Sequence, residues 1–499
     1  MNALLYAVII PFFGAIVCIP SRGRIAASAA VLSAVFILGL SVKLLFLVWR
    51  QGAIHVQLGG WVAPLGIALR LDGLGVLFVL LTAMVGTLIT LYAVRFFSAE
   101  QGQSDTAGYF WALWLILWAG LNGIFMCADL FNAYVLLEVT TMAAVGLSII
   151  SGSPASLKAG LRYLLAAMLG SFMYLLGVTL VYSKAGMLDF SLLSAVTEPG
   201  PVWASAFGFM VFGLALKSAL LPFHFWLPPA HSNAPAPVSA ILSALVVKAS
   251  FFLLLRVWFT VFTGITRVPA GQLPGFFLGV LGGAAVLWGS LQAIRQIRMK
   301  PLLAYSTVGQ MGYLFLVFAL VSGPEGQKWS SLVWTGTVFY ALSHCLAKAG
   351  LFLSVGCLVR AMGTDHLQAM RNVAGRLPVV TFALGVAGVS LMGLPPSAGF
   401  VAKWMLLRGS LAAGQWWWAG VIVLGGLLTA AYVFKILSYT FVPCSEDAAE
   451  LQPVPWLMTL SALGLGVLCV LFGFRADEVI TLLGQGTSAV LPGIGEGVP

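Results

Sequence analysis

The stretch LALKSALLPFHFWLPPAHSNAPAPVSA, residues 214–240, sets one lysine, two histidines and five prolines among residues that are otherwise apolar. Proline inside a helix removes a backbone hydrogen bond and clashes with the preceding turn. The apolar helix that carries Lys217 is therefore expected to break at Pro222. The freed backbone groups then need protein or water as partners, because lipid offers none.

The rest of the chain is as apolar as this stretch. It has 499 residues, of which 61% are hydrophobic and 8% are charged, with a mean hydropathy of +1.03. Soluble domains carry about 25% charged residues. Apolar runs of about 20 residues, the length that spans a bilayer, recur from end to end, and there are about 14 of them. We therefore predict an all-α polytopic membrane protein with about 14 transmembrane helices.

Basic residues are distributed unevenly between alternate connections. One set includes Arg95, Arg295 and Arg298, and it outnumbers the opposite set, which includes Arg50 and Lys184. The positive-inside rule assigns the richer set to the cytoplasm. We expect a protein of the cell inner membrane with both termini outside the cytoplasm. The net charge of +10 then reflects topology, and nucleic acid is not an expected partner.

The first apolar run is followed, not preceded, by basic residues in Ser21-Arg22-Gly23-Arg24. This order favours a retained first helix over a cleaved signal peptide.

A second span, VVTFALGVAGVSLMGLPPSAGFVAKWMLL, is interrupted by Pro395 and Pro396, with Lys403 close behind. Interrupted helices at corresponding positions in two halves point to a transport site. We therefore expect two inverted five-helix repeats, each a proton half-channel with one broken helix. The expected divisions are N-terminal helices in 1–108, repeats in 109–263 and 272–442, and a C-terminal helix and tail in 443–499. Ordinary proline kinks in a bundle are the alternative.

Glu138 lies deep inside the span DLFNAYVLLEVTTMAAVGL. A charge at the bilayer centre costs roughly 2.5–3.5 kcal/mol on insertion scales, so Glu138 should have a basic partner. We predict that the partner is Lys217. Burial lowers the pKa of a lysine and an adjacent carboxylate raises it, so such a lysine can load and release a proton. A static ion pair that fixes helix packing is the alternative.

Other titratable residues lie within spans. His344 and Lys348 are four residues apart and share a helix face, and histidine titrates near neutral pH. With Lys248 before them and Lys403 after them, they form an expected row of protonatable groups at mid-membrane depth. For His344 alone, a purely structural histidine is nearly as good an interpretation.

Further residues have weaker signals. His224 and His231 follow the first break, in a loop on the predicted cytoplasmic side, where they could form a proton entrance or cap helix ends. Lys43, Arg256 and Lys435 lie nearer the ends of their spans and could snorkel towards water. The six cysteines form no CxxC pair, so we expect no metal site. No nucleotide-binding or cluster-binding motif is evident, so no cofactor is expected either.

Four motifs, LALKSALLPFHFWLPPAHSNAPAPVSAILSALVVK, MKPLLAYSTVGQMGY, SHCLAKAGLF and GLPPSAGFVAKW, occur in this order. Together they resemble the antiporter-like membrane subunits shared by multisubunit sodium/proton antiporters, membrane-bound hydrogenases and respiratory complex I. The resemblance covers roughly residues 70–440. It implies about fourteen transmembrane helices, two inverted repeats and a central hydrophilic axis.

The resemblance also implies roles for single residues. It makes Glu138 the acidic partner, Lys217 the lysine of the first broken helix, Lys248 the connecting lysine and Lys403 the terminal lysine. His344 and Lys348 match the polar helix between the halves. Some complex I subunits carry glutamate where this chain has Lys403, which excludes that subtype. DLFNAYVLLEV and SGSPASLKAGLRYLL look most like the antiporter and hydrogenase branch, and like the D-type antiporter subunit in particular.

Three functions remain open from the sequence. The first is a proton-translocating subunit of a cation (sodium)/proton antiporter. The second is the same fold driven by electron transfer in other subunits of an NADH-quinone oxidoreductase or a hydrogenase. The third is an inert membrane scaffold. The first two require other membrane subunits as partners.

Overall fold

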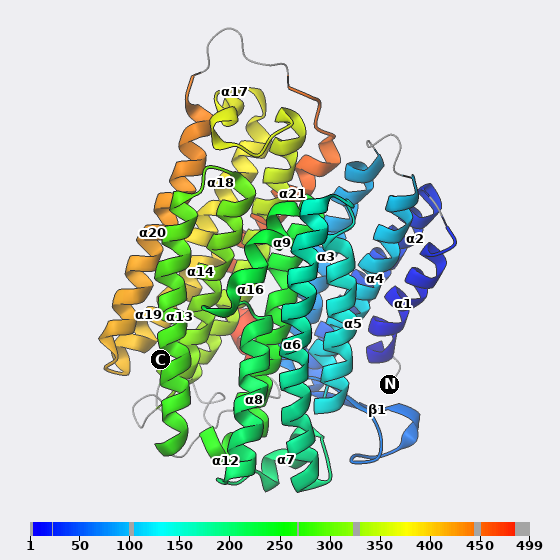
Figure 1. The fold of residues 1–499 in the computed structure, drawn as a ribbon, viewed down its shortest axis with the longest axis vertical. Helices are drawn as coiled ribbons and strands as arrows, with labels where there is room; N and C mark the ends of the chain where they lie inside the picture. Colours follow the sequence, from blue (N-terminus) through cyan, green and yellow to red (C-terminus); the bar gives the residue numbers. More distant parts are fainter. Residues whose placement is uncertain are drawn as a thin grey trace.

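A computed structural model describes residues 3–21, 23–98, 104–266, 269–322, 330–443 and 451–484, with the backbone alone for 98, 104–108 and 269–271. Long helices pack side by side in a tall bundle (Figure 1). Within the described ranges, eleven helices are long and apolar enough to cross a membrane, and three shorter apolar helices accompany them. Arg22, residues 444–450 and the tail from 485 lie outside the described residues.

The chain up to Lys217 contains helices and one β-hairpin. The elements are α1 (Ala3–Cys18), α2 (Arg24–Gln51), β1 (Ile54–Gln57), β2 (Ala68–Leu71), α3 (Gly73–Ser98), α4 (Ser104–Met126), α5 (Leu130–Ser148), α6 (Pro154–Ala185), α7 (Phe190–Val196) and α8 (Pro201–Lys217).

Helices continue after the first interruption. The elements are a 3₁₀ turn (Phe223–Trp226), α9 (Leu227–Asn233), α10 (Ala236–Ile241), a π-helical turn (Leu242–Val246), α11 (Val247–Arg256), a second π-helical turn (Val257–Val261), α12 (Thr263–Thr266), α13 (Pro269–Arg295), α14 (Met299–Leu320), α16 (Ser330–Met362), a 3₁₀ turn (Leu367–Met370), α17 (Val373–Arg376), α18 (Pro378–Met392), α19 (Ala398–Ala412), α20 (Trp416–Phe441), α21 (Trp456–Phe474) and α22 (Ala476–Gly484).

The predicted all-α polytopic fold is confirmed, with one addition. β1 and β2 pair antiparallel, with Ile54 opposite Leu71 and Gln57 opposite Ala68. In ALRL the side chains alternate between partly and fully buried, which is the period of a strand with one buried face. The hairpin was not predicted, because this segment reads only as a connection between spans.

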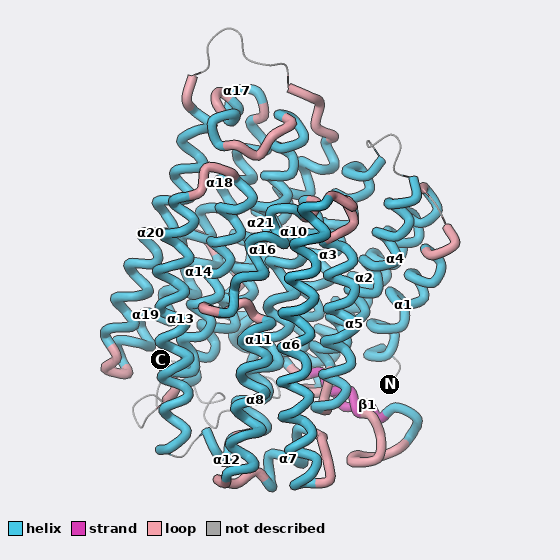
Figure 2. The backbone as a smooth tube through the Cα atoms, in the orientation of Figure 1, coloured by secondary structure: helices cyan, strands magenta, loops and turns pink. Residues whose placement is uncertain are grey.

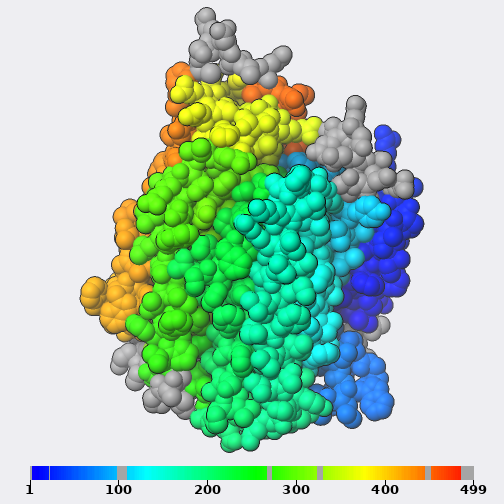
Figure 3. Space-filling view, in the orientation of Figure 1, coloured from blue at the N-terminus to red at the C-terminus, as the bar shows by residue number. Residues whose placement is uncertain are grey.

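The β-hairpin lies in the lower part of the bundle (Figure 1). Loops gather at its two ends, and a loop also interrupts helices between them (Figure 2). Side chains fill the spaces between the ribbons on the face shown in Figure 3. Three spans form the interior, because their most apolar windows are 94–100% buried: Ala236–Val261, Met299–Leu320 and Ser330–Met362.

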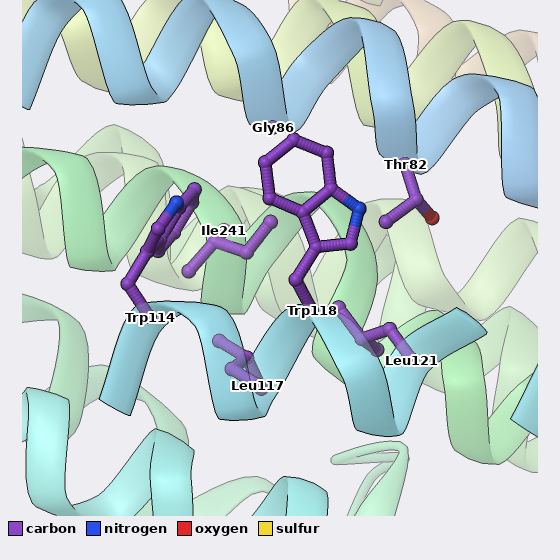
Figure 4. A pocket seen from close by; sticks show the side chains of 7 residues that line it. All are labelled: Thr82, Gly86, Trp114, Leu117, Trp118, Leu121 and Ile241. Atoms are coloured by element: carbon purple, nitrogen blue, oxygen red, sulfur yellow. The ribbon is translucent and has the colours of Figure 1, made fainter. Parts of the chain in front are cut away.

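The helices approach closely where small residues allow it. Trp114 and Trp118 of α4 point towards α3 and α10, with Thr82, Gly86 and Ile241 around them (Figure 4). A Cβ atom on Gly86 would lie 2.8 Å from the Trp118 ring, so only glycine fits there without a shift. The gap that remains has no room for a water molecule. This contact is therefore packing and not a ligand site.

The two interrupted helices run in opposite directions. The chain rises from α8 to α9 and descends from α18 to α19, and both interruptions fall between the ends of the bundle (Figure 1). Each begins in the same way, because Ala219 (φ 53°) and Gly393 (φ 84°) adopt left-handed conformations. The next amides, of Leu220 and Leu394, bond back five residues to Ala215 and Val389. This is the Schellman ending of a helix.

The first helix therefore ends earlier than predicted. α8 stops at Lys217, whereas the sequence placed the break at Pro222. The Schellman turn has already closed the helix before the proline, which follows because it cannot continue a helix. Lys217 is thus the last residue of α8 and not a residue one turn inside it.

Arg256 does not snorkel, which the sequence had allowed. Its guanidinium is buried and donates to both carboxylate oxygens of Asp72, at 2.7 and 2.5 Å. Asp72 is fully buried, also accepts from the Gly75 amide at 3.0 Å, and lies 3.6 Å from Arg70. The start of α3 and the end of α11 meet here, so Arg256 has a carboxylate partner inside the protein.

Candidate functional site

Glu138 and Lys217 lie in contact across α5 and α8. The Lys217 Nζ atom is 3.4 Å from Glu138 Oε1 and 2.8 Å from the Thr141 hydroxyl. The hydroxyl of Ser171, on α6, also donates to Glu138 Oε1. Lys217 sits at the C-terminal end of α8, where the helix dipole favours a cation. Three helices thus converge on the pair that the sequence suggested.

A small cavity extends from Lys217 towards α11. About 10 Å³ of it is open to the centre of a water molecule, which is about the minimum for one ordered water. Its walls include Thr140, Tyr163 and Ser250. The Thr140 hydroxyl is buried without a hydrogen-bond partner among the described residues. A water here would satisfy that hydroxyl, and Ser250 in the cavity wall lies two positions after Lys248 on α11.

Lys248 lies in the first turn of α11 and is completely buried. Its ammonium donates to the Ser243 carbonyl, in the π-helical turn that precedes α11. Such turns change the hydrogen-bond register of the backbone and often occur at functional sites. The Cys345 thiol, from α16, donates to the neighbouring Ala244 carbonyl at 2.6 Å. A backbone carbonyl therefore holds Lys248, and no carboxylate of the described chain pairs with it.

His344 and Lys348 lie on α16, and both are buried. The Lys348 ammonium donates to the Leu303 carbonyl at 2.7 Å and to the Ser306 hydroxyl on α14. Both ring nitrogens of His344 are buried and lack partners within the described ranges. Its ring stacks over Tyr340 with centroids 6.2 Å apart. Unpaired buried nitrogens are rare and point to an ordered water.

Lys403 lies on α19 and reaches back to α18. Its ammonium donates to the carbonyls of Leu391 and Met392, both at 3.0 Å. It also lies 4.9 Å from the Tyr313 ring centre and 5.9 Å from that of Tyr340, within cation–π range. A Cβ atom on Gly393 would lie 2.6 Å from Lys403 Cδ, so glycine both turns the chain and leaves room for the lysine stem.

Three of the central lysines and His344 lie in one region of the interior. His344 is within electrostatic range of Lys248, Lys348 and Lys403, and Lys348 is within range of Lys248. The cavity beside Lys217 is also lined by Ala249 and Ser250, which follow Lys248 on α11. The structure thus brings His344 near Lys248, Lys348 and Lys403, and a role of these residues in proton transfer stays a prediction.

A polar cluster beside this row was not predicted. The Gln310 amide, on α14, donates to Thr429 and Tyr432 of α20, both at 2.9 Å, and accepts from the Tyr340 hydroxyl. Gln310 is fully buried. The sequence does contain a signal for it, because a buried amide in an apolar span must find partners or cost several kcal/mol. The cluster joins the α16 residues to the wall around Lys403.

The two histidines after the first break lie apart. His224 is in the 3₁₀ turn at the interruption and is half-buried, with its ring 4.7 Å from Trp288. His231 is on α9, fully buried, with its ring stacked on Phe352 at 5.0 Å. The expectation that both lie in a loop is wrong, because helical structure resumes soon after Lys217. Neither nitrogen of His231 has a partner among the residues described.

Polar residues lead from His231 towards the upper end of the bundle. Lys300, at the start of α14, donates to the Ala234 carbonyl just beyond α9 at 2.9 Å. Asp365 accepts from Arg298 at 2.7 Å, and its other carboxylate oxygen is buried without a described partner. Lys300 lies within electrostatic range of both Asp365 and His231. These loop and helix-start residues had no predicted role in transport.

No metal site is visible in the described part of the chain, where no group of three or more His, Cys, Asp or Glu side chains is placed to bind an ion. The free cysteines among these residues are all buried. The side chains that gather here are amines, imidazole, hydroxyls and a carboxylate, which are groups able to exchange protons.

Residues 127–429 match the family described as NADH:quinone oxidoreductase/Mrp antiporter, TM. The chain belongs to this family. It is 34% identical to the N subunit of NADH-quinone oxidoreductase from Desulforudis audaxviator, covering 87% of this chain and 86% of that protein. It is 28% identical to the D subunit of the Na(+)/H(+) antiporter from Alkalihalophilus pseudofirmus, covering 88% and 87%.

A solved structure supports the same assignment. A chain of the Mrp complex from Dietzia sp. DQ12-45-1b superposes with a TM-score of 0.87 at 27% identity, over 98% of this chain and 97% of that one. The family includes both antiporter and oxidoreductase subunits, so the chain is an antiporter-like membrane subunit. The prediction that the chain is a D-type antiporter subunit is more specific than this family assignment.

Proposed function

We propose that the chain is the proton-translocating membrane subunit of a multisubunit sodium/proton antiporter. The observation that carries the proposal is the row of buried cations between the two interrupted helices, from the Glu138–Lys217 pair to Lys403. Burying so many cations in a membrane protein is costly. A transport role gives a reason for that cost, whereas packing alone is better served by apolar residues.

The proposed route has two half-channels. Residues 109–263 supply Glu138, Lys217 and Lys248, and residues 272–442 supply His344, Lys348 and Lys403. Protons would enter from the cytoplasmic end past Asp365 and Lys300 to His231, which lies within electrostatic range of Lys248 and Lys348. One carboxylate oxygen of Asp365 and both ring nitrogens of His231 are buried without a described hydrogen-bond partner. Such atoms are usually satisfied by buried water, which supports a hydrated route here. His224, which is half-buried in the 3₁₀ turn at the interruption, is a weaker candidate for an entrance.

Lys217 would carry its proton under the control of Glu138. The carboxylate stabilises the ammonium while the two groups are in contact. When they separate, the ammonium loses its counter-charge in an apolar setting and gives its proton to water in the adjoining cavity. The neutral amine then accepts another proton when the contact re-forms. Pro222, Pro395 and Pro396 would keep the interruptions open, so that carbonyls and water are available to the two lysines.

A second candidate function is the same translocation inside a redox complex. It is favoured by the 34% identity to the N subunit of an NADH-quinone oxidoreductase. In that case, electron transfer in other subunits would supply the energy. The third candidate, an inert scaffold, predicts that the central lysines can all be replaced without loss of function.

We further propose that other membrane subunits are its partners, since the relatives are named as subunits. The location would be the cell inner membrane, with both termini outside the cytoplasm. The upper end of the bundle in Figure 1 would then face the cytoplasm. The connections at that end carry the richer set of basic residues.

The test is ion flux in sealed vesicles that contain the whole complex. Proton uptake that requires sodium and no electron donor would support the antiporter. Proton uptake that requires an electron donor and does not depend on sodium would contradict the antiporter and support the function in a redox complex. Four single variants test the scaffold: Lys217→Ala, Lys248→Met, Lys348→Met and Lys403→Ala. If each of them keeps full flux, the inert scaffold is the function that remains.

A further inference from the structure

A large apolar groove lies away from the row of cations. It has a volume of about 600 Å³ and is formed by α2, α3, α21 and α22. Leucine, phenylalanine and tryptophan side chains make most of its walls, among them Phe46, Leu77, Leu468 and Phe472. Its volume is within the range of small-molecule sites, roughly 300–1,000 Å³.

The groove sits at the lower end of the bundle. Its residues come from the end of α2, the start of α3, the end of α21 and α22. The β-hairpin joins α2 to α3 in the lower part of the bundle (Figure 1), so the ends of these two helices that line the groove lie on that side. Trp49 stands near the end of α2 and is 41% exposed. Tryptophan is enriched at the level of lipid headgroups. The groove therefore runs from the headgroup region into the hydrocarbon.

One charged pair lies at the headgroup end. Arg475 follows the last residue of α21, and its side chain is 74% exposed. It donates to Glu478 on α22, whose side chain is 46% exposed. Arginine has five donors, so this single bond leaves others free. Both charges line the groove, and the other described residues of its walls are uncharged.

We propose that this groove binds a zwitterionic phospholipid with an ethanolamine headgroup. The phosphate would accept from the free guanidinium donors of Arg475, a geometry that arginine provides for phosphate. The primary ammonium would donate to the Glu478 carboxylate. One acyl chain would lie along Phe46, Leu77 and Leu468. A purely anionic headgroup would leave Glu478 facing a negative charge, and a choline headgroup has no N–H to donate.

This site is independent of the proposed transport function. It uses none of the residues assigned to the proton route, and it lies on helices outside the two proposed repeats. Loss of lipid binding with intact flux, or the reverse, would therefore separate the two proposals.

The test measures the phospholipid retained by the complex. The complex would be reconstituted in vesicles that contain phosphatidylethanolamine, phosphatidylcholine and phosphatidylglycerol in equal amounts, extracted in mild detergent and analysed by native mass spectrometry. We expect one retained phosphatidylethanolamine. Leu468→Trp should fill the groove and reduce retention by about tenfold, equivalent to 1.4 kcal/mol. Leu427→Trp is the matched control, because Leu427 is a 64% exposed residue of α20.

Two charge variants test the headgroup without filling the groove. Arg475→Gln should lower retention of every phospholipid, whereas Glu478→Gln should remove only the preference for ethanolamine. Equal retention in Leu468→Trp and Leu427→Trp would overturn the site, provided that both complexes melt at the same temperature as the parent. A preference for phosphatidylglycerol would overturn the assigned headgroup. Cross-linking of Trp49→Cys to another subunit, with no lipid retained, would show that a protein partner fills the groove instead.

Discussion

The Nζ atom of Lys403 lies 3.0 Å from the carbonyl oxygen of Met392, so an ammonium on one half of an interrupted helix caps the other half. The first interruption is built differently. Lys217 ends its own half-helix and contacts a carboxylate from α5. The two interruptions therefore share the backbone turn, whereas their lysines have different partners.

Glu138→Gln should abolish proton flux. The amide keeps the size and the bond from Ser171 but removes the charge opposite Lys217. We expect a decrease of about 10²-fold or more, the usual range for a proton-transfer group, with unchanged assembly on size-exclusion chromatography. Ser171→Ala is the control, since it removes one neutral donor and should retain most of the flux. Near-normal pumping by Glu138→Gln would refute the pairing.

Lys217→Ala and Lys217→Arg should both stop transport. Alanine has no site for the proton, and guanidinium does not deprotonate in proteins. The pH gradient formed in inverted vesicles measures the effect, with membrane insertion checked by immunoblotting. Substantial activity in Lys217→Arg would show that the residue supplies only a fixed positive charge, and the carrier role would have to be dropped.

Lys403→Ala should also stop transport, by removing the cation between the α18 carbonyls and the two tyrosine rings. Lys403→Arg separates charge from proton exchange, because it preserves a cation that cannot deprotonate. Loss of the pH gradient in both variants is the expected result. If Lys403→Arg pumps normally, Lys403 caps the helix and does not carry protons.

Lys248→Met should interrupt transfer between the halves. Methionine fills a similar space, but it cannot accept a proton or donate to the Ser243 carbonyl. We expect flux to fall by about 10²-fold, while Cys345→Ala, which removes the neighbouring thiol contact, leaves flux nearly unchanged. Persisting flux in Lys248→Met would mean that the route bypasses this residue.

Asp72→Asn should destabilise the fold without a specific effect on transport. It leaves the Arg256 guanidinium buried without a counter-charge, which costs about 3–5 kcal/mol. Thermal unfolding of the detergent-solubilised complex should detect the loss, and Asp72→Leu combined with Arg256→Leu should recover much of it. The exposed Arg475–Glu478 pair is the control, since breaking it with Glu478→Gln should cost about 0–1 kcal/mol. If breaking either pair lowers the unfolding temperature equally, the buried Asp72–Arg256 contact does not stabilise the fold more than the exposed pair does.

The sequence by itself determined that the chain crosses the membrane many times, that two helices are interrupted, and that Glu138 and the central lysines lie inside apolar spans. Bilayer thickness fixes the length of an apolar run, and proline and left-handed turns stop a helix locally. A charge inside such a run is visible without any structure. These features depend on residues within a few positions of one another, so Lys217, Lys403 and Glu138 could be recognised directly.

Only the tertiary structure decided what each of these side chains contacts. Asp72 meets Arg256 across 184 residues, and Gln310 meets Thr429 across 119. Such contacts depend on how helices cross and rotate against one another, which the 3.6-residue period of one helix does not specify. For the same reason, His231 is fully buried whereas His224 is half-buried, although the two are only seven positions apart in the sequence.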